Sequence, residues 1–484
     1  MYYQEPFRQQ LHYSPRENWM NDPNGLVYFE GEYHLFYQYN PYGNDHAHMH
    51  WGHAVSQDLT HWKELPVALE PDELGTIFSG GAVVDKGNSS GLFQQEAGGM
   101  VAIYTQDGAT QQQSIAYSED HGRTWTKYKH NPVIENQTIK DFRDPKVFWH
   151  EETQKWIMSL ACGDHIQFYR SPNLIDWTYQ SSFGQEYGSH AGVWECPDLF
   201  SLTVESTATQ QWVLIVSIND GGPNGGSAVQ YFTGDFDGVQ FHANETPTEA
   251  IKWADEGTDF YAAVSWENTA SRYWIGWMNN WQYAGKVPVS PWRSSMSIVR
   301  RLSLQQVNDT YVLKQTPTLP DDLWDEQTQT DKSQRLVPTN DIAAFDISPL
   351  SDIQLTVGEK NSSTGWGIYF ISDLEERFTV EFDESKHTYT VHRTEGMTDF
   401  SPHFPGEHTG SLHRWKVEKV HCLLDHASIE LFINDGLSVS TTLLFPKGSL
   451  SRLEVFCKDQ PLVLDNVNIT DRVSIWNDQH TPVN

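Results

Sequence analysis

The sequence is poor in cysteine, which argues against a fold held together by disulfide bonds. Only four cysteines occur in 484 residues, at Cys162, Cys196, Cys422 and Cys457, and their spacing forms no Cys-x-x-Cys metal or redox pair. We expect free thiols, although Cys422 and Cys457 could pair in an oxidising compartment. A chain of this length buries a large core without such cross-links, and it is long enough for two or three domains.

Positive charge and long apolar segments are also scarce. The chain has 32 basic against 64 acidic residues, a formal charge of −32, and a surface this negative argues against a nucleic-acid partner. The longest apolar runs fall well short of the ~18 residues of a membrane-spanning helix. The first residues lack the basic and apolar segments of a signal peptide. We therefore expect a soluble protein, either cytoplasmic or secreted with its leader already removed, and no membrane partner.

Aromatic residues, in contrast, are abundant, at 13 % of the chain with 19 tryptophans, and they reveal an internal repeat. A short aromatic and apolar run recurs every 56 to 67 residues, starting at Tyr33, Met100, Trp156, Trp212 and Trp274. Repeats of about 40–60 residues built from short strands are typical of β-propeller blades. Five copies therefore predict five blades. A two-sheet sandwich could hold as many strands, but it would not need this long-period self-similarity.

The repeat ends before a polar, acidic and turn-rich segment, and a different pattern follows. Runs such as Ile353–Val357 and Ser428–Ile433 alternate between apolar and polar residues, as half-buried antiparallel strands do. The sequence therefore predicts an all-β protein. We expect a five-bladed β-propeller over residues 1–325, a linker over 326–338 and a C-terminal β-sandwich over 339–484.

Three acidic residues occupy matching places in the repeat. Asp22, Asp144 and Glu195 precede an apolar run by 11 to 17 residues, and a proline follows each within two positions. Equivalent positions in different blades lie at the same end of a propeller, so we expect the three carboxylates to converge on the central channel. The alternative, that each acid only caps a turn, would be favoured for any one of them alone but not for three in register.

Converging carboxylates have a specific chemistry. They raise one another's pKa and can divide the roles of acid and nucleophile. Two carboxylates about 5–5.5 Å apart can hydrolyse a glycosidic bond with retention of configuration. Abundant tryptophan, tyrosine and amide side chains suit a sugar site, where ring faces stack and hydroxyls need hydrogen-bond partners. The pattern therefore favours a retaining glycoside hydrolase.

The segments that carry these acids resemble the three signature motifs of glycoside hydrolase family 32, which comprises invertases, exo-inulinases, levanases and related β-fructosidases. The motifs are Trp19–Gly25, Phe142–Pro145 and Trp194–Pro197. Two further segments, Asp259–Trp266 and Asn280–Ala284, are similar to the levanase and exo-inulinase branch. The resemblance implies a five-bladed propeller followed by a β-sandwich, in agreement with the repeat.

The resemblance also implies roles for individual residues. Asp22 is expected to be the nucleophile, Glu195 the general acid and base, and Asp144 the residue that binds fructosyl hydroxyls and stabilises the transition state. The residues at positions that line the fructose pocket of the family are Asn21, Gln38, Phe78, Ser79, Arg143 and Trp281.

The implied activity is that of a retaining exo-β-fructosidase that releases terminal fructose from levan, inulin or sucrose. No cofactor is expected, because carboxylates supply both the covalent and the proton-transfer chemistry. A fructosyltransferase, which passes the fructosyl group to a sugar instead of water, is the alternative. A non-catalytic fructan-binding propeller is disfavoured, because it would have no reason to keep both Asp22 and Glu195 as acids.

One position departs from the family pattern. His46 stands where relatives usually carry a tryptophan, eight residues after Gln38, and an imidazole offers less apolar surface and can titrate. We therefore expect substrate affinity or preference to differ from that of relatives. His46, His48 and His50 alternate as ligands on a strand would, with His53 close behind. Because no cysteine or further ligand motif accompanies them, we predict polar loop histidines and no metal site.

Overall fold

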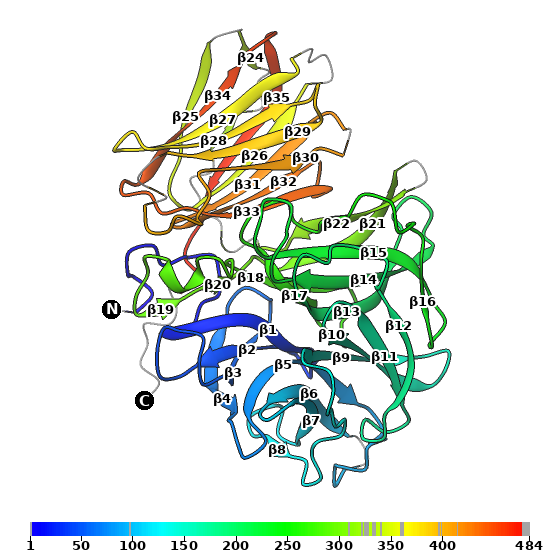
Figure 1. The fold of residues 1–484 in the computed structure, drawn as a ribbon. Helices are drawn as coiled ribbons and strands as arrows, with labels where there is room; N and C mark the ends of the chain where they lie inside the picture. Colours follow the sequence, from blue (N-terminus) through cyan, green and yellow to red (C-terminus); the bar gives the residue numbers. More distant parts are fainter. Residues whose placement is uncertain are drawn as a thin grey trace.

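The computed structural model describes residues 2–476 except 96–97, 308–309, 321–322, 324–328, 332–334, 339–340, 359–362, 395–396, 398 and 414. These residues form two β-structured bodies, a larger N-terminal one and a smaller C-terminal one (Figure 1). The short 3-10 helix η1 (Ala284–Lys286) lies between two strands of the N-terminal body. No helix within the described residues is long and apolar enough to cross a membrane.

The N-terminal body consists of five small sheets that stand around a common axis (Figure 1). The first two sheets contain β1 (Asn18–Phe29), β2 (Glu32–Asn40), β3 (His50–Ser56) and β4 (Lys63–Leu69), then β5 (Thr76–Asp85), β6 (Gly99–Asp107), β7 (Gln111–Ser118) and β8 (Thr126–Lys127). The third and fourth contain β9 (Phe142–His150), β10 (Lys155–Cys162), β11 (Ile166–Ser171) and β12 (Thr178–Phe183), then β13 (Trp194–Thr203), β14 (Gln210–Ile218), β15 (Ala228–Phe236) and β16 (Phe241–Ala243). The fifth contains β17 (Tyr261–Ser265), β18 (Tyr273–Met278), β20 (Ser295–Met296), β21 (Arg300–Val307) and β22 (Thr310–Pro317).

Local turn chemistry makes these sheets antiparallel. Glu30 and Gly31 alone separate β1 from β2, with φ angles of 46° and 95°. Two residues with positive φ match the right-handed twist of the flanking strands, and glycine adopts such a conformation at little cost. The hairpin turn therefore fixes the register in which Phe29 lies opposite Glu32.

The first strands of the five sheets form the inner wall of the propeller. Each contacts the next in the order β1, β5, β9, β13 and β17, and β17 contacts β1 again. The short strand β19 (Trp292–Arg293) reinforces the closure by pairing in parallel with β1. The prediction of a five-bladed propeller is confirmed.

Every inner strand carries a β-bulge near its N-terminal end. At this point two residues of the inner strand lie opposite one residue of the second strand. The bulged pairs are Asn21–Asp22, Phe78–Ser79, Asp144–Pro145, Cys196–Pro197 and Ala262–Ala263. A bulge re-aims side chains, and Asp144, Cys196 and Ala262 have positive φ angles of 66°, 47° and 52°. The bulges therefore change the directions of the side chains at one end of the channel in all five blades.

The C-terminal body is a sandwich of two antiparallel sheets. One sheet contains β23 (Gln329–Asp331), β24 (Arg335–Val337), β26 (Ser351–Val357), β31 (Lys419–Asp425), β32 (Ser428–Ile433), β33 (Ser438–Leu443) and β35 (Leu462–Asp471). The other contains β25 (Ile342–Asp346), β27 (Gly365–Ser372), β28 (Arg377–Asp383), β29 (Thr388–Arg393), β30 (Glu407–Ser411) and β34 (Leu450–Cys457). The prediction of a second, all-β domain with a sandwich architecture is confirmed.

The segment predicted as a linker, residues 326–338, contains two of these strands. β23 and β24 lie inside it and both pair with β35. Strands of three residues are too short for an apolar alternation to be recognised in the sequence. Residues 326–328 and 332–334 of the segment lie outside the described residues. The domain boundaries stay predictions, but the described part of this segment is joined to a sandwich sheet.

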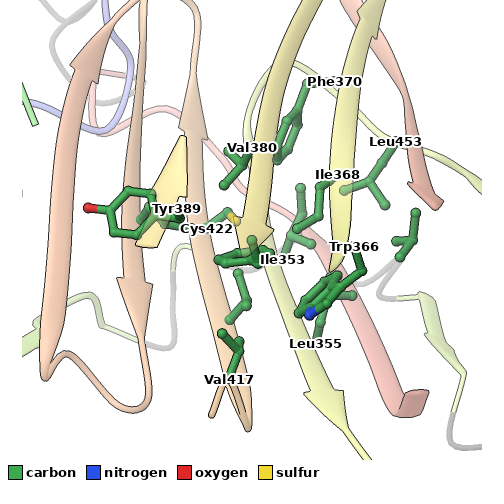
Figure 2. Close-up of a cluster of buried hydrophobic side chains, with 14 of the residues drawn as sticks. Ile353, Leu355, Trp366, Ile368, Phe370, Val380, Tyr389, Val417, Cys422 and Leu453 are labelled. Carbon is green, nitrogen blue, oxygen red and sulfur yellow. The ribbon is translucent and has the colours of Figure 1, made fainter. Parts of the chain in front are cut away.

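Alternating apolar residues of the two sheets fill the sandwich core (Figure 2). Ile353 of one sheet belongs to the same buried cluster as Trp366 and Phe370 of the other. Cys422 and Cys457 are also part of this cluster, and all four cysteines are buried free thiols. The sandwich core is therefore held together by packing. The prediction of free thiols is confirmed.

A buried charge network joins the two bodies. Nδ1 of His12, a residue of the propeller, lies 2.7 Å from Oδ2 of Asp425 on β31, and its Nε2 lies 3.0 Å from Oε1 of Glu430 on β32. Glu430 also accepts a hydrogen bond from Nη2 of Arg300 on β21, and Arg300 reaches Oδ2 of Asp255 at 3.0 Å. Buried charges require such partners, so the relative placement of the two bodies is fixed by matched groups.

Candidate active site

The three predicted carboxylates lie at the bulged ends of inner strands. Asp22 is on β1, Asp144 on β9 and Glu195 on β13. Asp22 and Asp144 are buried, and the side chain of Glu195 is 16 % exposed. The expected convergence on one end of the channel is therefore seen, and each acid is held by its own set of partners.

Asp22 is oriented by two neutral donors. Its Oδ2 accepts a hydrogen bond from Oγ of Ser79 at 2.8 Å, and its Oδ1 accepts one from Nδ2 of Asn21 at 3.0 Å. The indole Nε1 of Trp19 donates to Oδ1 of Asn21 at 2.7 Å, which fixes the direction of that amide. These neutral donors hold the carboxylate in place, and no cationic side chain within the described residues forms an ion pair with it.

Cys196 connects Asp22 to Asp144. Its thiol lies 3.5 Å from Oδ2 of Asp22 and 3.6 Å from Oδ2 of Asp144, and its backbone N–H donates to Oδ2 of Asp144 at 2.9 Å. The backbone N–H of Asp144 donates to Oγ1 of Thr105 at 2.9 Å, which anchors the bulge to β6. Burial raises the pKa of Asp144; the charge of Arg143 opposes this rise, while the negative charges of Glu195 and Asp22 add to it.

Glu195 has one ionic and one neutral partner. Its Oε1 accepts hydrogen bonds from Nε and Nη2 of Arg143 at 3.1 and 2.8 Å, and its Oε2 accepts one from the hydroxyl of Tyr261. Nη1 of Arg143 is held in turn by Oε1 of Gln111 at 3.1 Å and Oδ1 of Asp141 at 2.7 Å.

These surroundings act on the pKa of Glu195 in opposite directions. Burial raises it, and the nearby charge of Asp22 raises it further. The Arg143 cation and the hydrogen bonds from Arg143 and Tyr261 lower it. The net pKa is above the ordinary glutamate value, which suits a group that must hold a proton until it meets a leaving group.

Aromatic rings border the carboxylates. Trp281 stacks on Trp19 with centroids 6.0 Å apart and packs against Trp277 at 4.8 Å. His46 meets Trp281 edge-on at 5.1 Å and Phe78 at 6.3 Å. Aromatic faces of this kind bind sugar rings. We refer to Trp19, His46, Phe78 and Trp281 as the aromatic wall. Within it, His46 stands at the position where a tryptophan is expected.

The neighbouring Trp51 does not replace the missing indole. It is fully buried between Phe36 and Tyr104, at 5.5 and 5.9 Å, and only its Nε1 reaches toward the wall, by donating to the carbonyl of Phe78 at 2.9 Å. Gln38, the last predicted pocket residue, is the β2 residue that faces the bulge at Asp22, and its amide donates to Oδ1 of Asn24 at 2.8 Å.

The histidines near this wall do not converge. His46 and His48 lie in the loop before β3, while His50 begins β3. His53 points into the core, where it stacks on Phe36 at 4.1 Å. Within the described residues no group of three or more His, Cys, Asp or Glu side chains could hold a metal ion.

Sequence reasoning missed two contacts of the site. Cys196 and Tyr261 both contact the predicted catalytic residues, but neither was predicted to belong to the site. Each lies at or beside a bulge, next to the position that carries the acid or its equivalent in another blade. Their position in the repeat could have indicated them, because residues at equivalent places in different blades lie at the same end of the channel.

Buried carboxylates at one mouth of the channel, bordered by aromatic rings, define the candidate active site of a glycoside hydrolase. The chain belongs to the glycosyl hydrolases of family 32: the N-terminal domain of that family matches residues 12–317 and the C-terminal domain matches residues 321–477.

Similar proteins agree with this assignment along the whole chain. The chain is 47 % identical over 493 residues to a levanase of Bacillus subtilis, which covers 98 % of this chain and 72 % of that protein. The crystal structure of an exo-inulinase from Aspergillus awamori matches with a TM-score of 0.90 and 34 % identity, over 98 % of this chain and 100 % of the other. A β-fructofuranosidase from Schwanniomyces occidentalis, complexed with fructosyl-erythritol, matches with a TM-score of 0.88 and 32 % identity, over 97 % and 98 %.

Proposed function

We propose that this family 32 enzyme is a retaining exo-β-fructosidase that releases terminal β-D-fructofuranosyl residues from levan, inulin and sucrose. The observation that carries the proposal is the local cluster around Cys196, whose thiol reaches both Asp22 and Asp144 and whose neighbour in the chain is Glu195. The levanase and exo-inulinase relatives support fructans as the substrate class.

Asp22 acts as the nucleophile in this proposal. One of its carboxylate oxygens attacks the anomeric carbon of the terminal fructosyl unit while the glycosidic C–O bond breaks, and a covalent fructosyl-enzyme forms. Ser79 and Asn21 hold the two oxygens in fixed directions, which limits the reorganisation needed for attack.

Glu195 serves both halves of the reaction. It first transfers its proton to the departing oxygen, and burial keeps that proton bound to higher pH than an exposed glutamate would. In the second half it takes a proton from water, whose oxygen attacks the anomeric carbon and frees Asp22. Arg143 and Tyr261 hold the carboxyl group in one orientation throughout.

Asp144 and the pocket residues bind the fructosyl unit. Asp144 accepts hydrogen bonds from fructosyl hydroxyls, and its charge stabilises the oxocarbenium-like transition state. The residues proposed to line the fructose pocket are Asn21, Gln38, Phe78, Ser79, Arg143 and Trp281. No cofactor enters the scheme, since the carboxylates supply both the nucleophile and the proton.

Kinetics and product analysis test the proposal. The wild-type enzyme should convert sucrose, inulin and levan to free fructose, and Asp22→Asn should lower kcat by roughly three orders of magnitude. Asp85→Asn is the matched control, because Asp85 is also buried on an inner strand but binds Ser89 and Ser90 at the opposite end of β5. Full activity of Asp22→Asn would overturn the role of nucleophile.

Two further measurements separate the roles. Glu195→Ala should slow natural substrates more than substrates with activated leaving groups, because poor leaving groups depend most on protonation; equal slowing would contradict the acid role. At high sucrose, oligofructosides in excess of free fructose would replace the hydrolase by a fructosyltransferase.

A further inference from the structure

We propose that the C-terminal sandwich positions the sugar pocket of the propeller, through Arg393, Asp259 and Tyr283 as positioning residues. The inference rests on the proposed function, because its readout is the binding and turnover of a fructoside. It assigns to the second domain a part in catalysis, although none of the residues of that domain that the structure describes lies among the carboxylates.

Asp259 is the centre of the connection. It precedes β17 on the propeller, is fully buried, and uses both carboxylate oxygens. Its Oδ1 accepts a hydrogen bond from the hydroxyl of Tyr283 at 2.6 Å, and its Oδ2 accepts one from the backbone N–H of Leu443 on β33 at 2.9 Å. One propeller carboxylate therefore binds a propeller tyrosine and the backbone of the sandwich at once.

Arg393 neutralises this carboxylate from the sandwich side. Its Nη2 lies 3.6 Å from Oδ2 of Asp259, and neither side chain is exposed. Its remaining nitrogens are fixed by backbone carbonyls, with Nε donating to Leu443 at 2.9 Å and Nη1 donating to Pro405 at 2.5 Å. A guanidinium held in this way has one orientation, so the position of Asp259 depends on the fold of the sandwich.

A second sandwich side chain touches Tyr283 directly. The ring of Phe404 meets the ring of Tyr283 edge-on, with centroids 5.0 Å apart, and also lies under the guanidinium of Arg393 at 4.3 Å. Tyr283 is thus held at its hydroxyl through Asp259 and at its ring through Phe404. A displacement of the sandwich would therefore act on both ends of the Tyr283 side chain.

Two residues of the candidate active site, Trp281 and Tyr261, lie close in sequence to Tyr283 and Asp259. Trp281 lies two positions before Tyr283, in a tight turn in which the Tyr283 N–H donates to the carbonyl of Asn280 at 3.1 Å. Tyr261 lies two positions after Asp259 and donates its hydroxyl to Glu195. Over two residues the backbone transmits a displacement of the anchor almost directly. The sandwich therefore sets both the aromatic wall and the partner of the general acid.

The connection from Tyr283 to Trp281 predicts a specific kinetic effect. Loss of the Tyr283 hydroxyl removes the hydrogen bond that positions Tyr283 and, through it, Trp281. Because Trp281 is proposed to contact the substrate equally in the ground state and the transition state, KM should rise while kcat stays nearly constant. A change at Phe404 should act in the same way, although Phe404 belongs to the other domain.

The experiment compares two substitutions with matched controls in the full-length enzyme, with sucrose as substrate. Tyr283→Phe and Phe404→Leu should each raise KM about threefold or more with kcat within about twofold of wild type. Tyr231→Phe removes a buried hydroxyl that accepts a hydrogen bond from the Leu313 N–H, and Phe378→Leu truncates a buried ring of the sandwich core. Both controls should keep the wild-type KM, even where they lower the melting temperature.

The outcomes are distinct. A wild-type KM in Tyr283→Phe overturns the proposal even if Phe404→Leu fails to fold, because the tyrosine change removes a single oxygen atom. Equal rises of KM in the controls also overturn it, since the effect would then be general loosening. If the wild-type enzyme itself releases no fructose from sucrose, inulin or levan, the proposed function fails instead.

Discussion

The thiol of Cys196 lies 3.5 Å from Oδ2 of Asp22, the oxygen that also accepts the hydroxyl of Ser79. A thiol is a weak donor, and burial raises the pKa of Cys196 well above its ordinary value, so it stays neutral. The contact therefore fills space beside the carboxylate without binding its negative charge tightly. A nucleophile benefits from such a neighbour, because strong hydrogen bonds would stabilise its unreacted form.

Cys196→Ser should consequently slow the enzyme. A hydroxyl forms stronger hydrogen bonds with an ionised carboxylate, so the ground state of Asp22 is stabilised and kcat/KM for sucrose should fall about tenfold, which corresponds to about 1.4 kcal/mol. Cys162→Ser is the control, since Cys162 is a buried thiol on β10 that donates to the carbonyl of Leu160 and packs in a hydrophobic cluster of the propeller. Activity of Cys196→Ser equal to that of the control would show that donor strength at this position is irrelevant.

Tyr261→Phe should shift the pH profile. The tyrosine hydroxyl lowers the pKa of Glu195, so its removal lets burial raise that pKa further. The proton of the general acid is then retained to higher pH, and the alkaline limb of kcat/KM should move upward. Tyr104→Phe, at a buried tyrosine on β6, should leave the limb in place. An unchanged or lowered alkaline limb in Tyr261→Phe would contradict the assignment of Glu195 as the acid.

Much of this arrangement follows from the sequence because rotational repetition is visible in it. The five recurring runs, the first at Tyr33 and the last at Trp274, predict the number of blades. The matching positions of Asp22, Asp144 and Glu195 in the repeat predict that the three carboxylates converge. Both inferences depend only on long-period spacing, which a single sequence retains.

What the sequence did not reveal depends on local geometry. The bulges beside Cys196 and Tyr261 cannot be recognised from the sequence alone, because a bulge is set by pairing between strands. His46 and His48 lie in the loop before β3, as predicted, whereas His50 is the first residue of β3. The strand β24 could not be predicted, because it has only three residues and pairs with β35, more than a hundred residues away.

His46→Trp should tighten substrate binding. An indole at this place adds apolar surface next to Trp281 and Phe78, which His46 already contacts at 5.1 and 6.3 Å. Larger aromatic faces bury more of a sugar ring, so KM for sucrose should fall about threefold, whereas His46→Ala should raise it. If both variants keep the wild-type KM, His46 does not contact the bound sugar.

The junction between the domains should make stability depend on pH through His12. Burial alone would lower the pKa of His12, but its hydrogen bonds to Asp425 and Glu430 raise it from 6.5 to about 9. A raised histidine pKa contributes stability that is fully present below pH 6.5 and is lost as pH rises through 9, a loss of about 3 kcal/mol. The melting temperature of the wild-type protein should therefore fall between pH 6.5 and 9.

His12→Gln should remove this slope and lower the melting temperature at pH 6.5, because Asp425 and Glu430 would lose a cationic partner in a buried place. His34→Gln is the matched control: burial lowers the pKa of His34 to about 4, so this histidine is neutral across the whole interval and the slope should survive. A melting temperature of the wild-type protein that stays constant from pH 6.5 to 9 would mean that His12 is neutral in the folded state.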